Sequence, residues 1–129
     1  MKIPYLEVSR GIFAPIITLE FWIGERWMAC EAYVDSGATY SIFHADVAAL
    51  LGIIYQKGRK IFVKVGDGGL IPVYLHRLLV RFANVEFNAV IGFSESLGVG
   101  FNLLGRVDFF ERFRVCFNDK EKVIETTLL

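Results

Sequence analysis

An aspartate, a serine and a glycine stand where an apolar segment of the chain ends. The segment from Trp27 to Val34 is typical of a buried strand, and Asp35-Ser36-Gly37 follows it directly. Aspartate is a poor strand former, and its carboxylate costs free energy to bury unless it is paired or protonated. Two such carboxyl groups about 3 Å apart share one proton, so that one acts as a base while the other acts as an acid. We therefore interpret Asp35 as a candidate catalytic group.

The chain contains a single Asp-Ser-Gly sequence, so a pair of these carboxyl groups requires a second copy of the chain. In that arrangement, Asp35 of each copy would contribute half of the catalytic pair. The alternative is an ordinary turn, because Asp, Ser and Gly favour turns through local hydrogen bonds and permissive dihedral angles. The three residues by themselves leave both interpretations open.

Five consecutive residues, Asp35-Ser36-Gly37-Ala38-Thr39, follow two apolar residues. This segment resembles the active-site loop of retropepsin-type aspartic peptidases, half-size relatives of the pepsins that work as homodimers. The resemblance implies that Asp35 is catalytic and that the Ser36 hydroxyl bonds to the partner loop at the dimer axis. It also implies that Gly37 offers its amide to a carboxylate. Ala38 and Thr39 would then bind substrate, with Ala38 keeping the floor of the cleft small.

The composition limits the classes of function. A chain of 129 residues fits one domain, residues 1–129, with a single core. Fourteen basic and fourteen acidic residues cancel, so neither a nucleic-acid partner nor an anionic membrane surface is indicated. The apolar fraction of 54% and the twelve phenylalanines are high, which suggests that a partner or a groove uses some apolar surface.

The N-terminal segment lacks the charged, apolar and small-residue regions of a signal peptide. Pro15 and Glu20 interrupt the apolar segment from Ile12 to Ile23, so this segment is not expected to span a bilayer. We therefore expect a cytoplasmic protein that is neither exported nor inserted in a membrane.

The cysteines and histidines do not form a metal-binding pattern. Cys30 and Cys116 lack the spacing of metal ligands, and without a secretion signal we expect them to be reduced apolar fillers. His44 and His76 are far apart, with no cysteine nearby, so zinc is not indicated. No metal and no other cofactor is expected.

Alternating apolar segments and turn residues predict a mainly β chain. Pro15–Trp22 and Trp27–Val34 should form a hairpin whose second strand delivers Asp35. Ala45–Leu51 contains helix formers with an apolar face and is closed by Gly52, which predicts a short helix. Further strands are expected at Met1–Val8, Arg59–Val65, Leu70–Phe82, Val85–Phe93, Arg114–Asn118 and Lys122–Leu128.

A glycine-rich turn joins two of the predicted strands. Gly66-Asp67-Gly68-Gly69 stands between Arg59–Val65 and Leu70–Phe82, and glycine supplies the positive dihedral angles of a tight hairpin. In retropepsin-like proteins a hairpin at this place is the flap that closes over a bound peptide, so the resemblance makes these four residues substrate-binding. The alternative is a plain surface hairpin in which Asp67 is a solvated turn residue.

A second motif, Leu103-Leu104-Gly105-Arg106, precedes a predicted short helix that ends near Phe113. Retropepsin-like chains carry a similar apolar-apolar-Gly-Arg sequence before their C-terminal helix, as structural support for the catalytic loop. An apolar strand must cross beneath that loop, and a glycine lets the backbone pass close to it. Viral members have an acid at the position of Thr39 that pairs with this arginine. We therefore expect Arg106 to bind Asp108 or a backbone carbonyl instead.

These observations together predict an all-β, retropepsin-like closed β-barrel or sandwich of hairpins with one or two short helices, closer to microbial single-domain members than to viral ones. The resemblance implies a homodimeric aspartic endopeptidase that hydrolyses extended segments of a protein or peptide substrate. Interleaved terminal strands, Lys2–Val8 and Val123–Leu129, would form the dimer. The alternatives are a peptide-binding module or a dimerisation domain of the same fold, in which Asp35 is only structural.

Overall fold

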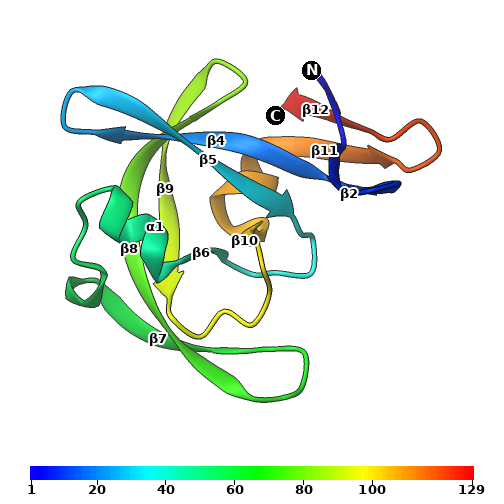
Figure 1. The fold of residues 1–129 in the computed structure, drawn as a ribbon. Coiled ribbons are helices and arrows are strands. Elements are labelled where there is room, and N and C mark those ends of the chain that lie inside the picture. The colour runs from blue at the N-terminus through cyan, green and yellow to red at the C-terminus, as the bar shows by residue number, and fades with distance from the viewer.

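A closed barrel of β-strands is the centre of the computed structural model, which describes residues 1–129 (Figure 1). Six strands follow one another around it in the order β4-β5-β10-β6-β9-β8, and pairing of β4 with β8 closes the ring, while β7 adds to the outer edge of β8. The bounds are β4 (Ile16–Ile23), β5 (Arg26–Val34), β6 (Ser41–His44), β7 (Arg59–Lys64), β8 (Leu70–Phe82), β9 (Val85–Ser94) and β10 (Asn102–Leu104). The predicted mainly β architecture is confirmed.

Apolar side chains that alternate along the strands fill the barrel. In β4, Ile17, Leu19 and Phe21 are buried and the residues between them are more exposed, which is the two-residue period of a strand with one face in a core. Phe21 packs edge-on against Phe43 of β6, with ring centroids 5.1 Å apart. Val34, the last residue of β5, is also buried in this core, so the loop that follows starts from a fixed point.

The helices are short, and none is long and apolar enough to cross a membrane. The helix α1 (Ala45–Leu50) begins directly after β6. Gly52, two residues beyond its end, has a positive φ of 73°, and its amide donates a hydrogen bond to the Ala49 carbonyl, which closes the C-terminus of the helix. A 3₁₀ turn, η1 (Tyr55–Lys57), leads into β7. The helix predicted at Ala45–Leu51 is therefore present, shorter by one residue.

The short helix predicted after Arg106 is present but irregular. It comprises η2 (Arg106–Phe110), in which Val107 and Asp108 have non-helical dihedral angles, and a helical turn at residues 111–112. The Val107 amide donates to the Thr39 carbonyl at 2.8 Å, and the Asp108 carboxylate accepts from the Val90 amide at 2.8 Å. These bonds to other segments hold the backbone out of a regular helix.

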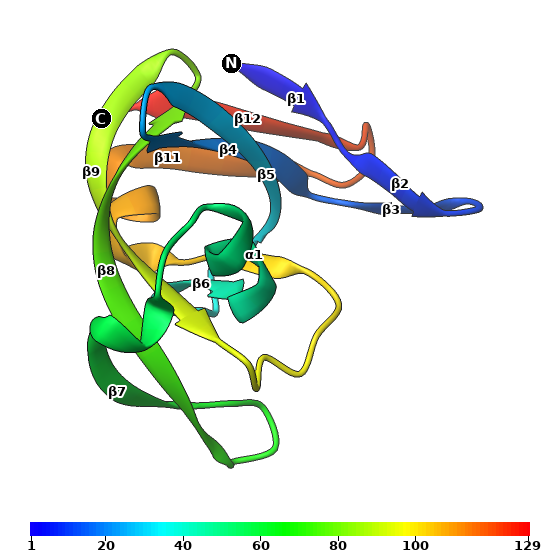
Figure 2. The same cartoon turned by 60° about the vertical axis from the view of Figure 1, so that its left-hand side comes forward.

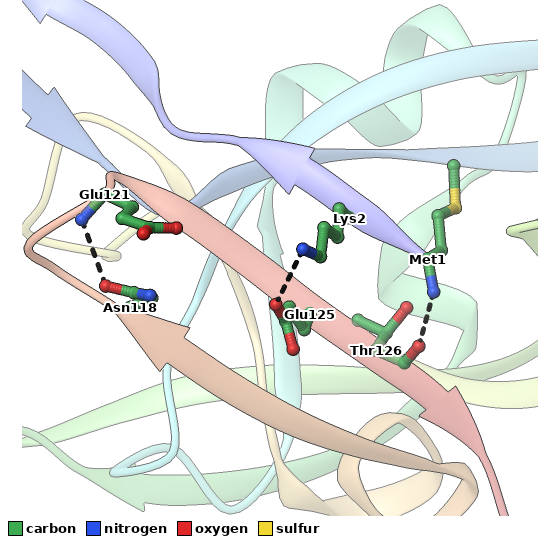
Figure 3. A network of polar contacts seen from close by, with 6 residues as sticks. All are labelled: Met1, Lys2, Asn118, Glu121, Glu125 and Thr126. Carbon is green, nitrogen blue, oxygen red and sulfur yellow. Dashed lines mark hydrogen bonds and ion pairs between the residues drawn. The ribbon is translucent and has the colours of Figure 1, made fainter.

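The two ends of the chain pair with each other. β1 (Lys2–Pro4), β12 (Val123–Leu128) and β11 (Phe113–Asn118) form a three-stranded sheet in that order. Figure 3 shows the Met1 amino group donating to the Thr126 carbonyl at 2.7 Å and the Lys2 ammonium 3.5 Å from the Glu125 carboxylate. Within one chain β1 pairs with β12, and the outer edges of β1 and β11 have no strand partner. The exchange of terminal strands between two copies stays a prediction.

A separate two-stranded hairpin, β2 (Leu6–Ser9) and β3 (Ile12–Ala14), follows β1 and extends away from the barrel (Figure 2). Gly11 closes its turn with φ of 74°, and its amide donates to the Glu7 carboxylate at 3.0 Å. The edge strand expected over Met1–Val8 is thus divided into β1 and β2. No third strand covers this hairpin, and its apolar side chains are largely exposed.

Candidate active site

Asp35 lies at the rim of the barrel, at the first position after β5. β10 runs parallel to β5 with Leu104 beside Val34, and the Asp35 amide donates to the Leu104 carbonyl at 2.9 Å. The Asp35 carboxylate accepts from the Gly37 amide at 2.8 Å. A Cβ atom at Gly37 would lie 3.1 Å from that carboxylate oxygen, so a larger residue would disturb the bond.

The backbone that follows β10 holds the far side of the same loop. The Arg106 amide donates to the Ala38 carbonyl at 2.9 Å, next to the bond between Val107 and Thr39. Gly105 makes this approach possible, because a Cβ atom there would lie 2.8 Å from the Ala38 carbonyl oxygen. The two sequence motifs, 35–39 and 103–106, are therefore in direct contact through their backbones.

The Arg106 side chain adds two bonds to this loop. Its Nη1 donates to the Ser36 carbonyl at 2.6 Å, and its Nη2 donates to the Thr39 hydroxyl at 3.1 Å. Of the two partners expected for Arg106, a backbone carbonyl is the one observed. Asp108 instead binds the Val90 amide. The neutral Thr39 hydroxyl thus binds Arg106 at the position where viral retropepsins have an acid.

A cavity of about 580 Å³ separates the Asp35 loop from the turn between β7 and β8 and from the loop after β9. We call it the hairpin cavity. Its walls are mainly apolar, from residues such as Ile42, Val63 and Leu97, and an extended peptide needs a groove of this kind with few polar groups in it. The predicted site residues that line it are Asp35, Gly37, Ala38, Thr39, Gly66, Asp67 and Leu103.

The turn between β7 and β8 is a tight hairpin, as predicted. Gly68 has φ of 88° and donates to the Val65 carbonyl at 2.9 Å, while the Val65 amide donates to the Gly69 carbonyl at 2.8 Å. The Asp67 carboxylate accepts from the Gly69 amide at 2.8 Å, as an aspartate does in a local turn. Gly66 and Asp67 line the hairpin cavity, and Gly68 and Gly69 do not.

A second cavity, of about 510 Å³, lies between the β2–β3 and β11–β12 hairpins and also reaches Asp35. We call it the outer cavity. Ser36 lines it together with Asp119, and the Tyr5 hydroxyl donates to the Asp119 carboxylate at 2.5 Å. Burial, and then this hydrogen bond, raise the pKa of Tyr5 to about 12. Sequence reasoning missed this cavity because no local pattern links Tyr5 to Asp119, 114 residues away.

The structure contains no group of three or more His, Cys, Asp or Glu side chains that could hold a metal ion. His76 is engaged locally, with its Nε2 atom 2.7 Å from the Tyr55 carbonyl oxygen. The polar side chains that line the hairpin cavity carry carboxyl, hydroxyl and amino groups, the amino group being that of Lys64.

Comparisons with known proteins place this geometry in a structural class. No protein-family model and no curated protein matches the sequence. The chain is similar to the crystal structure of a retropepsin-like aspartic protease from Rickettsia conorii, with a TM-score of 0.68 and 20% identity over 97% of this chain and 98% of that one. It is also similar to the EIAV protease in complex with the inhibitor HBY-793, with a TM-score of 0.50 and 15% identity over 72% and 82% of the chains. The chain therefore has the fold of the retropepsin-like aspartic proteases, as the sequence motifs predicted.

Proposed function

We propose that this protein is a homodimeric aspartic endopeptidase that hydrolyses extended segments of protein substrates. The observation that carries the proposal is the place of Asp35 in the retropepsin-like fold. It stands at the end of a core strand, in a loop held by Gly105 and Arg106, and borders the hairpin cavity.

The chemistry requires two Asp35 carboxyl groups with one proton between them. The ionised carboxylate removes a proton from a bound water while the oxygen of that water attacks the scissile carbonyl carbon. The protonated carboxyl group gives its proton to the carbonyl oxygen. As the C–N bond of the tetrahedral intermediate breaks, the leaving nitrogen takes a proton from the carboxyl group that was protonated by the water. A hydroxyl group of the intermediate gives its proton to the other carboxylate and becomes the carbonyl of the new carboxylic acid. The enzyme returns to its starting protonation state without a covalent intermediate.

The neighbouring residues take supporting roles in this proposal. Gly37 orients the Asp35 carboxylate through the hydrogen bond that the Gly37 amide donates to it. Ser36 is exposed beside Asp35 and would bond to the partner loop. Ala38 and Thr39, on the floor of the hairpin cavity, would lie against the peptide backbone. Because a single chain supplies only one Asp35, the active form must contain two copies.

The turn at residues 66–69 would act as a flap over the peptide. Gly66 and Asp67 face the hairpin cavity, and β7 has a free edge on the side away from β8. Extended peptides gain affinity from backbone hydrogen bonds and specificity from pockets for alternate side chains. The apolar walls of the hairpin cavity favour substrates with an apolar side chain next to the cleaved bond.

Substitution of Asp35 by Asn tests the proposal, because the amide cannot exchange a proton in this way. Wild-type protein should cleave members of a diverse peptide library between about pH 4 and 7, and Asp35→Asn should lower the rate at least about a hundredfold. Asp46→Asn, an exposed aspartate on α1, is the matched control and should cleave normally. Equal cleavage by Asp35→Asn, or no cleavage of any peptide by the wild type, would overturn the assignment.

A further inference from the structure

The outer cavity carries a carboxylate without a cationic partner. Asp119 accepts the Tyr5 hydroxyl, and no Lys, Arg or His nitrogen lies within 4.0 Å of it. Lys122 lines the same cavity and is also in no ion pair. Tyr5 is buried and holds Asp119 in one place, so the free carboxylate oxygen is ordered before any partner arrives.

A cation without a carboxylate partner contacts the Asp35 loop. Arg106 uses two of its five N–H donors, for the Ser36 carbonyl and the Thr39 hydroxyl. It makes no ion pair within the chain and it is exposed. Ser36 thus shares the outer cavity with an unpaired carboxylate, Asp119, and accepts a hydrogen bond from an unpaired cation, Arg106.

Two aromatic side chains form exposed walls of the outer cavity. Phe13 of the β2–β3 hairpin is 42% exposed and Phe117 of β11 is 39% exposed. Large apolar groups grouped at the edge of a charged site are typical of surface that a partner covers. An arginine guanidinium is well suited to such a place, since it binds carboxylates with paired donors and stacks on aromatic rings.

We propose that the outer cavity receives the Arg106 side chain of a second copy of this chain, which pairs with Asp119. The inference rests on the proposed function, because paired Asp35 groups require a two-fold axis beside Asp35 and Ser36. The outer cavity shares both residues, so it faces the second copy. A two-fold contact is isologous, and each Arg106 meets the partner's Asp119 in the same way, which gives two ion pairs in each dimer. The pairs lie next to the catalytic loops and would hold them in register.

Sedimentation equilibrium on the full chain tests this contact. Asp119→Asn should raise the dimer dissociation constant at least about tenfold, because it leaves two arginines unpaired in the interface. Glu121→Gln is the matched control, since Glu121 is an exposed acid in the turn of the same hairpin (Figure 3). Glu121 does not line the outer cavity. It should dimerise as the wild type does. Cleavage by Asp119→Asn should return when the protein concentration exceeds its raised dissociation constant.

Reversing the charge at each of the two positions gives a second, independent test of the contact. Asp119→Arg should not dimerise alone, because each arginine at position 119 would face Arg106 of the other copy. Arg106→Glu should also not dimerise alone, because each glutamate at position 106 would face Asp119 of the other copy. An equal mixture should form heterodimers, in which both contacts pair an acid with a base. If Arg106→Glu does not fold by circular dichroism, the comparison of Asp119→Asn with Glu121→Gln decides.

The outcomes separate this inference from the proposed function. Peptide cleavage by a wild-type dimer, together with normal dimerisation of Asp119→Asn, would overturn the contact and leave the endopeptidase standing. A normal Asp119→Asn dimer that loses only peptides with a basic side chain would assign Asp119 to substrate and also overturn the contact. Wild-type protein that stays monomeric, even with a hydroxyl-containing transition-state mimic, would overturn both.

Discussion

Arg106 and Ser36 lie 70 positions apart in the sequence, and the Arg106 guanidinium donates to the Ser36 carbonyl at 2.6 Å. A second donor of the same group reaches the Thr39 hydroxyl at 3.1 Å. One side chain therefore fixes both ends of the segment 36–39, which directly follows Asp35. Because the Asp35 amide and carboxylate are held separately by Leu104 and Gly37, the loop is preorganised before any ligand binds.

Replacing Arg106 by Lys keeps the charge but removes the planar pair of donors. We expect Arg106→Lys to lower the free energy of unfolding by about 1–2 kcal/mol, measured by urea denaturation. In peptide cleavage, kcat should fall by a larger factor than KM rises, because the position of Asp35 would be less well defined. Thr39→Val removes only the weaker bond and should lose less in both assays. A larger loss in Thr39→Val would contradict this division.

Gly105 is required for space rather than for its dihedral angles. A Cβ atom there would lie 2.5 Å from the Tyr40 carbonyl oxygen and 2.8 Å from that of Ala38. Gly105→Ala should therefore destabilise the fold by about 1–3 kcal/mol, since backbone must move. Gly100→Ala is the control, because nothing lies within 4 Å of a Cβ atom at that position. Equal thermal midpoints for the two variants would show that the loop accommodates the Cβ atom at position 105 without loss of stability.

Local patterns predicted the parts of the site that consist of neighbours in sequence. The Asp35 loop, the turn at residues 66–69 and the segment 103–106 all carry glycines or apolar pairs whose local geometry is restrictive. Their order along the chain was enough to predict which of them meet. The Asp35 loop and segment 103–106 are in contact, and they face the turn across the hairpin cavity.

Long-range bonds account for what the sequence did not predict. The irregular turn at Asp108 depends on the Val90 amide, 18 residues away, and helix propensity contains no information about such a partner. The pairing of β1 with β12 joins the two ends of the sequence, and no local pattern indicates such a contact. The β2–β3 hairpin has only a short turn at Gly11 as a local signal.

Asp108 combines an unusual backbone with a specific bond. Its φ is 68°, a conformation that Asn and Asp tolerate better than most residues, and its carboxylate satisfies the Val90 amide. Asp108→Ala should lower the free energy of unfolding by about 1–3 kcal/mol, because a partly buried donor loses its acceptor. Asp108→Asn keeps an acceptor oxygen and should lose about half as much or less. Denaturant titrations of both variants measure the difference.

A bidentate ion pair links two strands of the barrel and makes its stability depend on pH. Glu20 of β4 accepts from Nε and Nη2 of Arg81 on β8, both at 2.9 Å. The hydrogen bonds from Arg81 hold the pKa of Glu20 below its ordinary value of 4.5, against the opposing effect of burial. Since the pKa is lowered on folding, the pair stabilises the protein above pH 4.5, and this stabilisation is lost as the pH falls through the pKa in the folded state.

Glu20→Gln should therefore lower the thermal midpoint by a few degrees at pH 7, and the difference from wild type should shrink progressively below pH 4.5. Glu25→Gln changes an exposed acid in the adjacent turn that forms no ion pair, and it should leave the midpoint unchanged. Melting curves between pH 3 and pH 7, followed by circular dichroism, compare the three proteins. A difference that grows toward acid pH would contradict the assigned direction.

The place of β10 between β5 and β6 has a consequence for biosynthesis. The carbonyl that fixes Asp35 belongs to Leu104, and the amides that fix Ala38 and Thr39 belong to Arg106 and Val107. A growing polypeptide cannot close the Asp35 loop until residue 107 has left the ribosome. During most of translation the nascent chain thus contains the Asp-Ser-Gly sequence without the hydrogen bonds that fix its geometry.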